Sequence, residues 1–145
     1  MAITTAMCTS FKAELLSGTH DFTTDNIKVA LIKVSPSGTY GAATTNYSDV
    51  TGNSDEATGT NYTVGGQTLD TPSITTSGTT AFVDFADETF SDITIATTGC
   101  IIYNASKSNK SICVIDFGGT ISSVAGNLTL EIPTADASNA IVRIA

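Results

Sequence analysis

The chain has 145 residues, of which 41% are hydrophobic and only 14% charged, and its 14 acidic and 6 basic side chains give a formal net charge of −8. This length fits a single domain over residues 1–145, and the apolar content is sufficient for a core, which excludes a disordered chain. The clusters of Lys and Arg that bind nucleic-acid phosphates are missing from the sequence, so we expect no direct contact with DNA or RNA.

The first residues predict a helix over 5–17. Met7, Phe11 and Leu15 recur at helical spacing, and Gly18 follows where a helix C-cap is expected. Such a helix carries one apolar stripe, which we expect to close one end of a β-domain or to contact a partner. The basic start and continuous apolar run of a signal peptide are absent, so we expect synthesis and folding in a cytoplasm and no membrane partner.

The segment 26–34 predicts the first long strand. Ile27, Val29 and Leu31 alternate on one face, while Ile32 and Val34 fall on the other. Apolar residues on both sides predict that both faces of this strand are at least partly covered.

Residues 35–60 differ from the rest of the chain, because they are dense in Ser, Thr, Gly, Asn and Asp and nearly empty of large aliphatic residues. A long segment of this kind predicts a projecting loop that meets another molecule, with a disordered surface loop as the alternative. The candidate partner-binding residues are therefore apolar side chains of the helix and tyrosines in or beside this loop: Met7, Phe11, Leu15, Tyr40, Tyr47 and Tyr62.

The remainder of the chain predicts short strands separated by small polar residues. Tyr62 and Val64 indicate a strand, Gly65 and Gly66 a turn or bulge, and 72–76 a further short segment. Six apolar runs follow: TTAFVDFA, DITIAT, CIIYN, SICVIDFGG, NLTLEIP and NAIVRIA. About eight or nine strands at this spacing predict an all-β domain, either a sandwich or a jelly-roll-like barrel, with one short helix. The last run is expected to be held in a sheet.

Side chains capable of catalysis are few and scattered. His20 stands beside Asp21, but adjacent residues of an extended chain point to opposite sides, so the pair does not preset a hydrogen bond. The carboxylates within 84–92 match no calcium-loop spacing and are better explained as a solvated turn. We therefore expect no catalytic residue, no metal, no cofactor and no enzymatic activity.

The three cysteines form no CxxC pair. Cys100 and Cys113 fall inside apolar strand patterns, which favours buried free thiols. A disulfide between them stays open as the alternative if their strands are neighbours.

Several segments resemble small virion structural proteins of tailed bacteriophages. They are AITTAMCTSFKAELLSGTHDF, TTAFVDFADETFSDITI, IIYNASKSNKSICVIDFGG and ADASNAIVRIA. The resemblance spans nearly the whole chain and is weakest over 35–60. The nearest role among these proteins is that of the capsid decoration, or cement, protein, a small β-rich module that sits on an icosahedral shell and clamps neighbouring major capsid subunits.

This resemblance implies a place on the capsid surface of a virion, the phage major capsid protein as partner, and a homo-oligomer, with a trimer favoured over a dimer. A rigid β-module with few reactive groups suits a clamp, because its binding energy is spread over a large area. The alternatives are a host-recognition or glycan-binding module of a tail or fibre, and a minor tail or joining protein.

Overall fold

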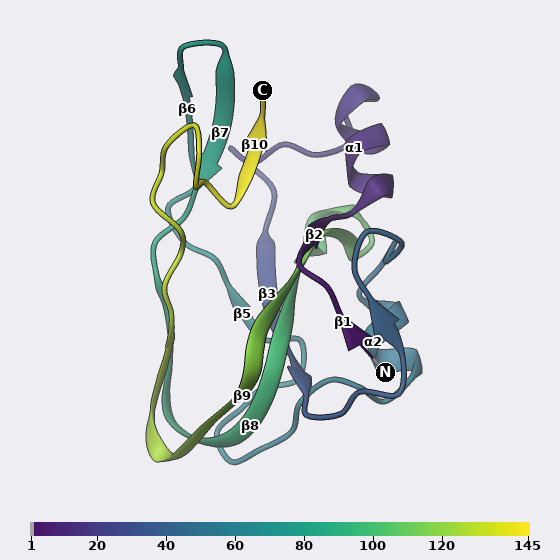
Figure 1. Ribbon diagram of the computed structural model, residues 1–145, viewed down its shortest axis with the longest axis vertical. Helices are drawn as coiled ribbons and strands as arrows, with labels where there is room; N and C mark the ends of the chain where they lie inside the picture. The colour runs from purple at the N-terminus through teal and green to yellow at the C-terminus, as the bar shows by residue number, and fades with distance from the viewer. Residues whose placement is uncertain (1) are drawn as a thin grey trace.

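A computed structural model describes residues 2–145 of the protein, and it is mostly β, with 48% of residues in strands and 11% in helices (Figure 1). The predicted all-β class is therefore confirmed. The strands are β1 Ala2–Ile3, β2 Ala6–Met7, β3 Ile27–Lys33, β4 Thr39–Tyr40, β5 Gln67–Thr68, β6 Ser73–Ser77, β7 Thr80–Asp84, β8 Glu88–Asn104, β9 Lys110–Leu130 and β10 Val142–Ile144. The helices are α1 Thr9–Leu16, α2 Ser48–Gly52 and the 3-10 turn η1 Ala105–Lys107.

The strands form three sheets in a sandwich-like arrangement. The largest sheet is antiparallel with the order β2-β9-β8-β3-β5, a second has the order β10-β7-β6, and β1 pairs in parallel with β4. In Figure 1 the three-stranded sheet stands at the upper left and α1 at the upper right, with β10 between β7 and the helix. Edge-to-face ring contacts join Phe11 to Phe22 and Phe22 to Phe85, with centroids 6.0 and 6.1 Å apart, and so connect α1 to the end of β7.

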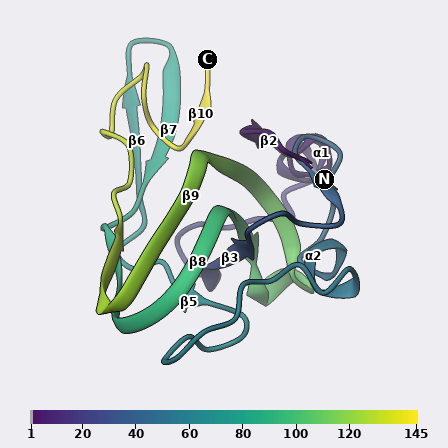
Figure 2. The same cartoon turned by 60° about the horizontal axis from the view of Figure 1, so that its bottom comes forward.

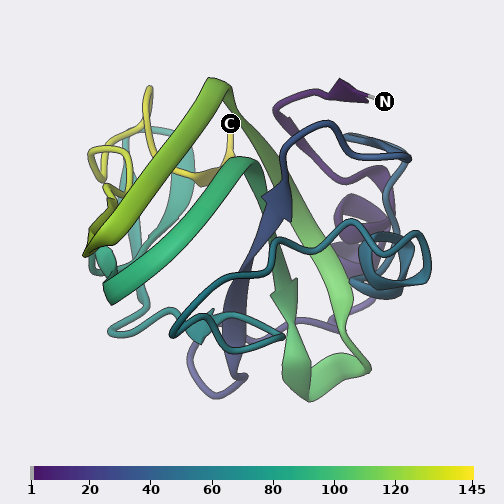
Figure 3. The ribbon, with the colours of Figure 1, turned by 90° about the horizontal axis from the view of Figure 1, so that it is seen from below.

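Four of the predicted runs belong to two long strands. β8 has 17 residues and β9 has 21, and they pair along their whole length with several shifts of register. At these shifts Asp92, Gly118 and Ala125 adopt positive φ angles of 51°, 76° and 48°. Figures 2 and 3 show the result, a β8–β9 ribbon bent into a V whose one arm lies beside β3. Bulges use the same residue types as turns, and for this reason the sequence pattern suggested separate strands.

The prediction for β3 is confirmed. This strand lies between β8 and β5. Val29, Ala30, Leu31 and Ile32 are all at most 1% exposed, so side chains on both faces are buried. The neighbouring layers therefore cover both sides of the strand, as a run of apolar residues in consecutive positions indicates.

The predicted helix over 5–17 is too long. The structure begins α1 at Thr9, and Ala6 and Met7 instead form β2, paired with Val114 and Cys113 of β9. Helical spacing over the first turn was thus overridden by tertiary strand pairing, which satisfies the same backbone groups.

The predicted projecting loop over 35–60 is wrong. This segment contains β4 and α2, and it buries Tyr40, Val50, Asp55, Glu56 and Ala57. Two of these five residues are carboxylates, whose burial is stabilised by hydrogen bonds that no local pattern reveals. A polar segment can pack when its polar groups find partners.

The strand expected at Tyr62 and Val64 is absent, since these residues lie in a turn region and β5 begins only at Gln67. The expected strands near 72–76 and 79–86 are present as β6 and β7. The last run is held in a sheet, because β10 pairs antiparallel with β7.

Candidate functional site

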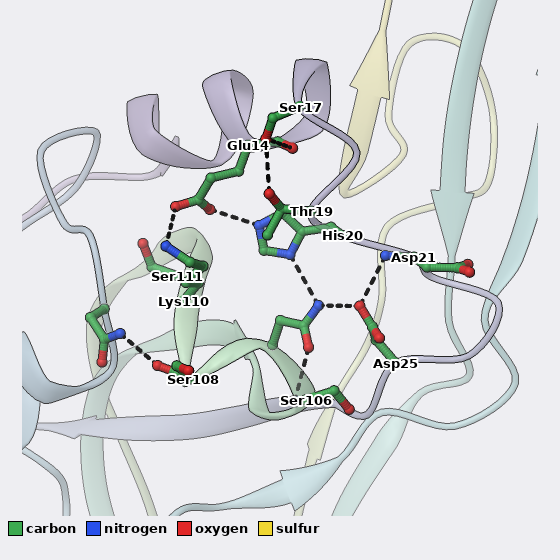
Figure 4. Close-up of polar contacts among 12 residues, drawn as sticks. Glu14, Ser17, Thr19, His20, Asp21, Asp25, Ser106, Ser108, Lys110 and Ser111 are labelled. Atoms are coloured by element: carbon green, nitrogen blue, oxygen red, sulfur yellow. Dashed lines mark hydrogen bonds and ion pairs between the residues drawn. The ribbon is translucent and has the colours of Figure 1, made fainter.

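The single histidine lies at the centre of a buried polar network just after α1 (Figure 4). Its side chain is fully buried, and the edge of its ring contacts Phe11, with centroids 4.9 Å apart. Nε2 is 2.7 Å from Oε2 of Glu14, and Nδ1 is 3.0 Å from Nδ2 of Asn104. The ring therefore connects the helix to the end of β8.

The hydrogen bonds assign the tautomer of His20. Oδ1 of Asn104 accepts from the backbone amide of Ser106, so the amide nitrogen of Asn104 faces the histidine and donates to Nδ1. The ring proton is then on Nε2, which donates to Glu14. Both ring nitrogens are occupied, so this histidine acts as a structural connector.

Two lysines complete the network. Lys110 lies 3.0 Å from Glu14, and Lys107 lies 3.5 Å from Asp25, whose other oxygen accepts from Asn104 at 2.7 Å. Burial alone would raise the pKa of Glu14, but hydrogen bonds from His20 and Lys110 lower it overall. The network thus surrounds the imidazole of His20 with hydrogen-bonded carboxylates.

A second network holds the segment 36–40 against β3. The fully buried carboxylate of Asp55 accepts from the amide of Gly38 at 2.7 Å and from the hydroxyl of Tyr40 at 2.5 Å. It also accepts from Ser37 and forms an ion pair with Lys33 at 2.9 Å. Burial would raise the pKa of Asp55, but these donors hold it well below its usual range.

Glu56 is the centre of a third network. Its carboxylate accepts from the hydroxyls of Tyr47 and Tyr62 and from the amide of Gly65. The ring of Tyr47 stacks on Tyr103 at a centroid distance of 4.5 Å. Burial, together with the adjacent carboxylate, raises the pKa of both tyrosines that donate to Glu56. Asp55 and Glu56 were not singled out from the sequence, and their position in a Ser/Thr-rich stretch carries no signal of burial.

The structure therefore separates the six sequence-predicted contact residues. Phe11 and Tyr40 are 0% and 2% exposed, so they are core residues and their side chains are not surface contacts. Tyr47 and Tyr62 are half-buried and bonded to Glu56.

Met7 and Leu15 are brought together at the surface. Both are half-buried, and both line a groove of about 300 Å³ beside α1. These are the two predicted contact residues that the structure places at a common surface hollow.

The prediction that the cysteines are buried free thiols is confirmed. Cys8, Cys100 and Cys113 are all free and buried. Cys113 lies opposite Ile102 and Cys100 opposite Ile115, so the two thiols are on neighbouring strands but in different register positions. Burial raises the pKa of Cys100 to about 12. Among residues 2–145, no group of three or more His, Cys, Asp or Glu side chains is placed to hold a metal ion.

Exposed apolar side chains also lie on the outer edge of β9, which we call the β9 edge and define as the side of residues 117–130 that faces away from β8. β2 pairs with β9 only at Cys113 and Val114, and within the described residues β8 is the only strand that pairs with residues 117–130, so their other side has no strand partner. The edge contains no charged residue and no Pro, and Ile121 and Val124 are 43% and 82% exposed. An apolar groove of about 310 Å³ adjoins it, lined among others by Ile115, Phe117, Leu128, Leu130 and Ile132.

Comparison with known proteins finds no matching family, no matching curated sequence and no matching solved structure. In the part of the chain that the structure describes, no helix is long and apolar enough to cross a membrane.

Proposed function

We propose that the protein is a non-enzymatic structural protein of a tailed-phage virion, and specifically a decoration protein. It binds the outside of the icosahedral shell as a homo-oligomer and clamps neighbouring major capsid subunits. The proposal joins two supports: the resemblance of several sequence segments to phage virion proteins, and the surface that the fold presents to other subunits.

The observation that carries the proposal is the β9 edge. Proteins usually protect a free strand edge with Lys, Pro or inward-pointing charges, because an unprotected edge pairs with other chains. This edge has none of those residues and lies beside an apolar groove. An uncharged, apolar strand edge on a rigid β-body is suited to be covered by another subunit.

The alternative of a glycan-binding module is less well supported. Sugar binding uses exposed aromatic rings, and the tyrosines that suggested this role are otherwise engaged. Tyr40 is buried against Asp55, and Tyr47 and Tyr62 donate to Glu56, so none of the three offers a free platform.

The test is co-sedimentation of the purified protein with DNA-free shells of the phage that encodes it. We expect saturable binding to the shells, with copies per particle in the hundreds by quantitative gel, because a decoration protein occupies positions repeated over the whole icosahedral surface. A glycan array probed with the same preparation should stay blank.

Saturation at tens of copies or fewer would instead identify a joining or tail protein. Absence from the shell pellet, or specific binding on the glycan array, would overturn the proposed role.

A further inference from the structure

A groove lies between α1 and the end of β10, and we call it the α1–β10 groove. One hollow of about 300 Å³ is lined by Met7, Lys12, Leu15, Leu16, Arg143 and Ile144. A second hollow of about 410 Å³ shares Leu15, Arg143 and Ile144 with the first, and Phe22, Val83 and Val142 contribute to its lining. Because the two hollows share these side chains, they adjoin one another along the same wall.

The groove gathers exposed apolar side chains. Of the seven large hydrophobic residues that are exposed in residues 2–145, three line its hollows: Leu16 at 93%, and Ile74 and Ile144 at 54% each. Exposed apolar side chains gathered around one groove are typical of a surface that binds another molecule.

A strand edge is available in the same place. β10 pairs with β7 on one side, and in the part of the chain that the structure describes no strand pairs with its other side. Figure 1 shows that this other side is the one turned towards α1. An extended peptide can add to such an edge through main-chain hydrogen bonds, while its side chains enter the hollows on either side.

The charges at the groove favour an acidic ligand. Three of the six basic residues, Lys33, Lys107 and Lys110, are in ion pairs with carboxylates of the chain. Two of the remaining three are Lys12 and Arg143, and both line the α1–β10 groove. Within the described residues neither has an ion-pair partner, although the chain has a large excess of carboxylates.

The acidic residues near the groove are engaged by their own loops. Asp136, whose pKa Arg143 helps to lower, accepts hydrogen bonds from the amides of Ser138 and Asn139. Asp21 lines the second hollow, but its carboxylate accepts a hydrogen bond from the backbone amide of Thr23. Arg143 donates one hydrogen bond to the carbonyl of Ala137, and its remaining N–H groups and the ammonium of Lys12 can bind carboxylates brought by a ligand.

We propose that the α1–β10 groove binds an extended segment of another protein that combines apolar side chains with at least one Asp or Glu. Its main chain pairs with β10, its apolar side chains cover Leu16 and Ile144, and its carboxylate lies between Lys12 and Arg143. A second copy of this chain fits less well, because a two-fold contact here would bring the unpaired cations of both copies together. This inference does not rest on the proposed role in a virion.

The test is selection of a displayed library of random peptides of about twelve residues on the purified protein. We expect enriched sequences in which apolar and acidic residues alternate. For a representative peptide, Leu16→Ser should weaken binding at least about tenfold, and so should the double variant Lys12→Glu/Arg143→Glu. Lys28→Glu is the matched control, because within the described residues Lys28 also has no ion-pair partner and it lines neither hollow. It should leave the affinity unchanged.

The inference would be overturned by no enrichment, by enriched peptides without acidic residues, or by affinities that the groove variants do not change. A self-association of the wild type that Leu16→Ser abolishes would also overturn it, by showing that a second copy fills the groove. Leu16 is almost fully exposed, so its replacement leaves the core intact. The selection contains no shells, and failure of shell binding would therefore leave this result standing.

Discussion

At the scale of single residues, the protein stabilises buried charge with hydrogen bonds from its own backbone and hydroxyls. Asp55 is the clearest case, since it is fully buried and accepts from two backbone amides and the hydroxyls of Ser37 and Tyr40, beside the ammonium of Lys33. Burial, reinforced by this carboxylate, raises the pKa of Tyr40 to about 12. The segment that composition marked as a loop is held in place by such contacts.

Asp55→Asn should therefore lower the free energy of unfolding at pH 7 by about 3 kcal/mol, because it leaves buried donors and Lys33 without their anion. The folded-state pKa of Asp55 is lowered, so its stabilisation is complete above the unfolded value near 4 and is lost as the pH falls through the folded value. The difference in the free energy of unfolding between wild type and variant should therefore become smaller below about pH 4. Urea titrations from pH 7 to acid pH measure it.

Asp84→Asn is the control, because Asp84 is half-exposed on β7, and we expect a change within about 0.5 kcal/mol at pH 7. If the loss of unfolding free energy in Asp55→Asn stayed constant down to acid pH, the ionised carboxylate of Asp55 would not be the stabilising group.

At the scale of elements, close approaches of the backbone decide where strands begin and bend. β5 follows Gly66, whose φ is +70° and whose missing side chain leaves room for the backbone of β3. A Cβ at this position would overlap the carbonyl oxygen of Val29. The glycine pair that indicated a turn is therefore also the point at which the chain crosses closely over a neighbouring strand.

Gly66→Ala should accordingly destabilise the protein by about 3 kcal/mol or more, because both the positive φ and the overlap with β3 must be relieved. Gly78→Ala separates the two effects, since Gly78 has a φ of +58° but open space around it. The free energy of unfolding of Gly78→Ala should fall by only about 1 kcal/mol. Denaturant unfolding of both variants gives the comparison, and equal losses would refute the close-approach explanation.

At the scale of the whole molecule, the chain folds as compactly as an ordinary monomer. Its accessible surface is 6941 Å², against about 7,000 Å² expected for a monomer of this mass. Many of the apolar side chains of β8 and β9 are buried in the core of the bent ribbon, while the β9 edge stays exposed. Subunit contacts at that edge are therefore not required for the fold itself.

From this we expect Val124→Lys to lower the oligomeric state without loss of stability. A lysine on the β9 edge places a charge where another subunit would pair. Val124 is 82% exposed, so the monomer should remain folded. Light scattering after size exclusion measures the mass, and thermal unfolding tests the fold.

Val64→Lys is the matched control, because it makes the same substitution at another exposed valine, outside the β9 edge. An unchanged mass for Val124→Lys, or an equal loss of mass in both variants, would show that the β9 edge is not the subunit contact.

The sequence alone was sufficient for the all-β class, the covered β3, the buried free cysteines and the pairing of the last strand. Each of these depends on local alternation of apolar residues or on the burial preference of a side chain, and both are visible in a single stretch of chain. The same kind of pattern predicted Met7 and Leu15 as partner-binding residues; the structure places both at the α1–β10 groove, and their role as contacts stays a prediction.

Only the tertiary structure decided the length of α1, the packing of 35–60 and the joining of four apolar runs into β8 and β9. In each case the deciding contact connects residues far apart in the chain: Met7 with Cys113, Asp55 with Lys33, and Phe90 with Leu128. Bulge residues look like turn residues, and buried carboxylates look like solvated ones, until their hydrogen-bond partners are in place. The sides of β9 and β10 that lack a strand partner within residues 2–145 belong to the same class, because a strand becomes an edge only through the order of its neighbours in the sheet.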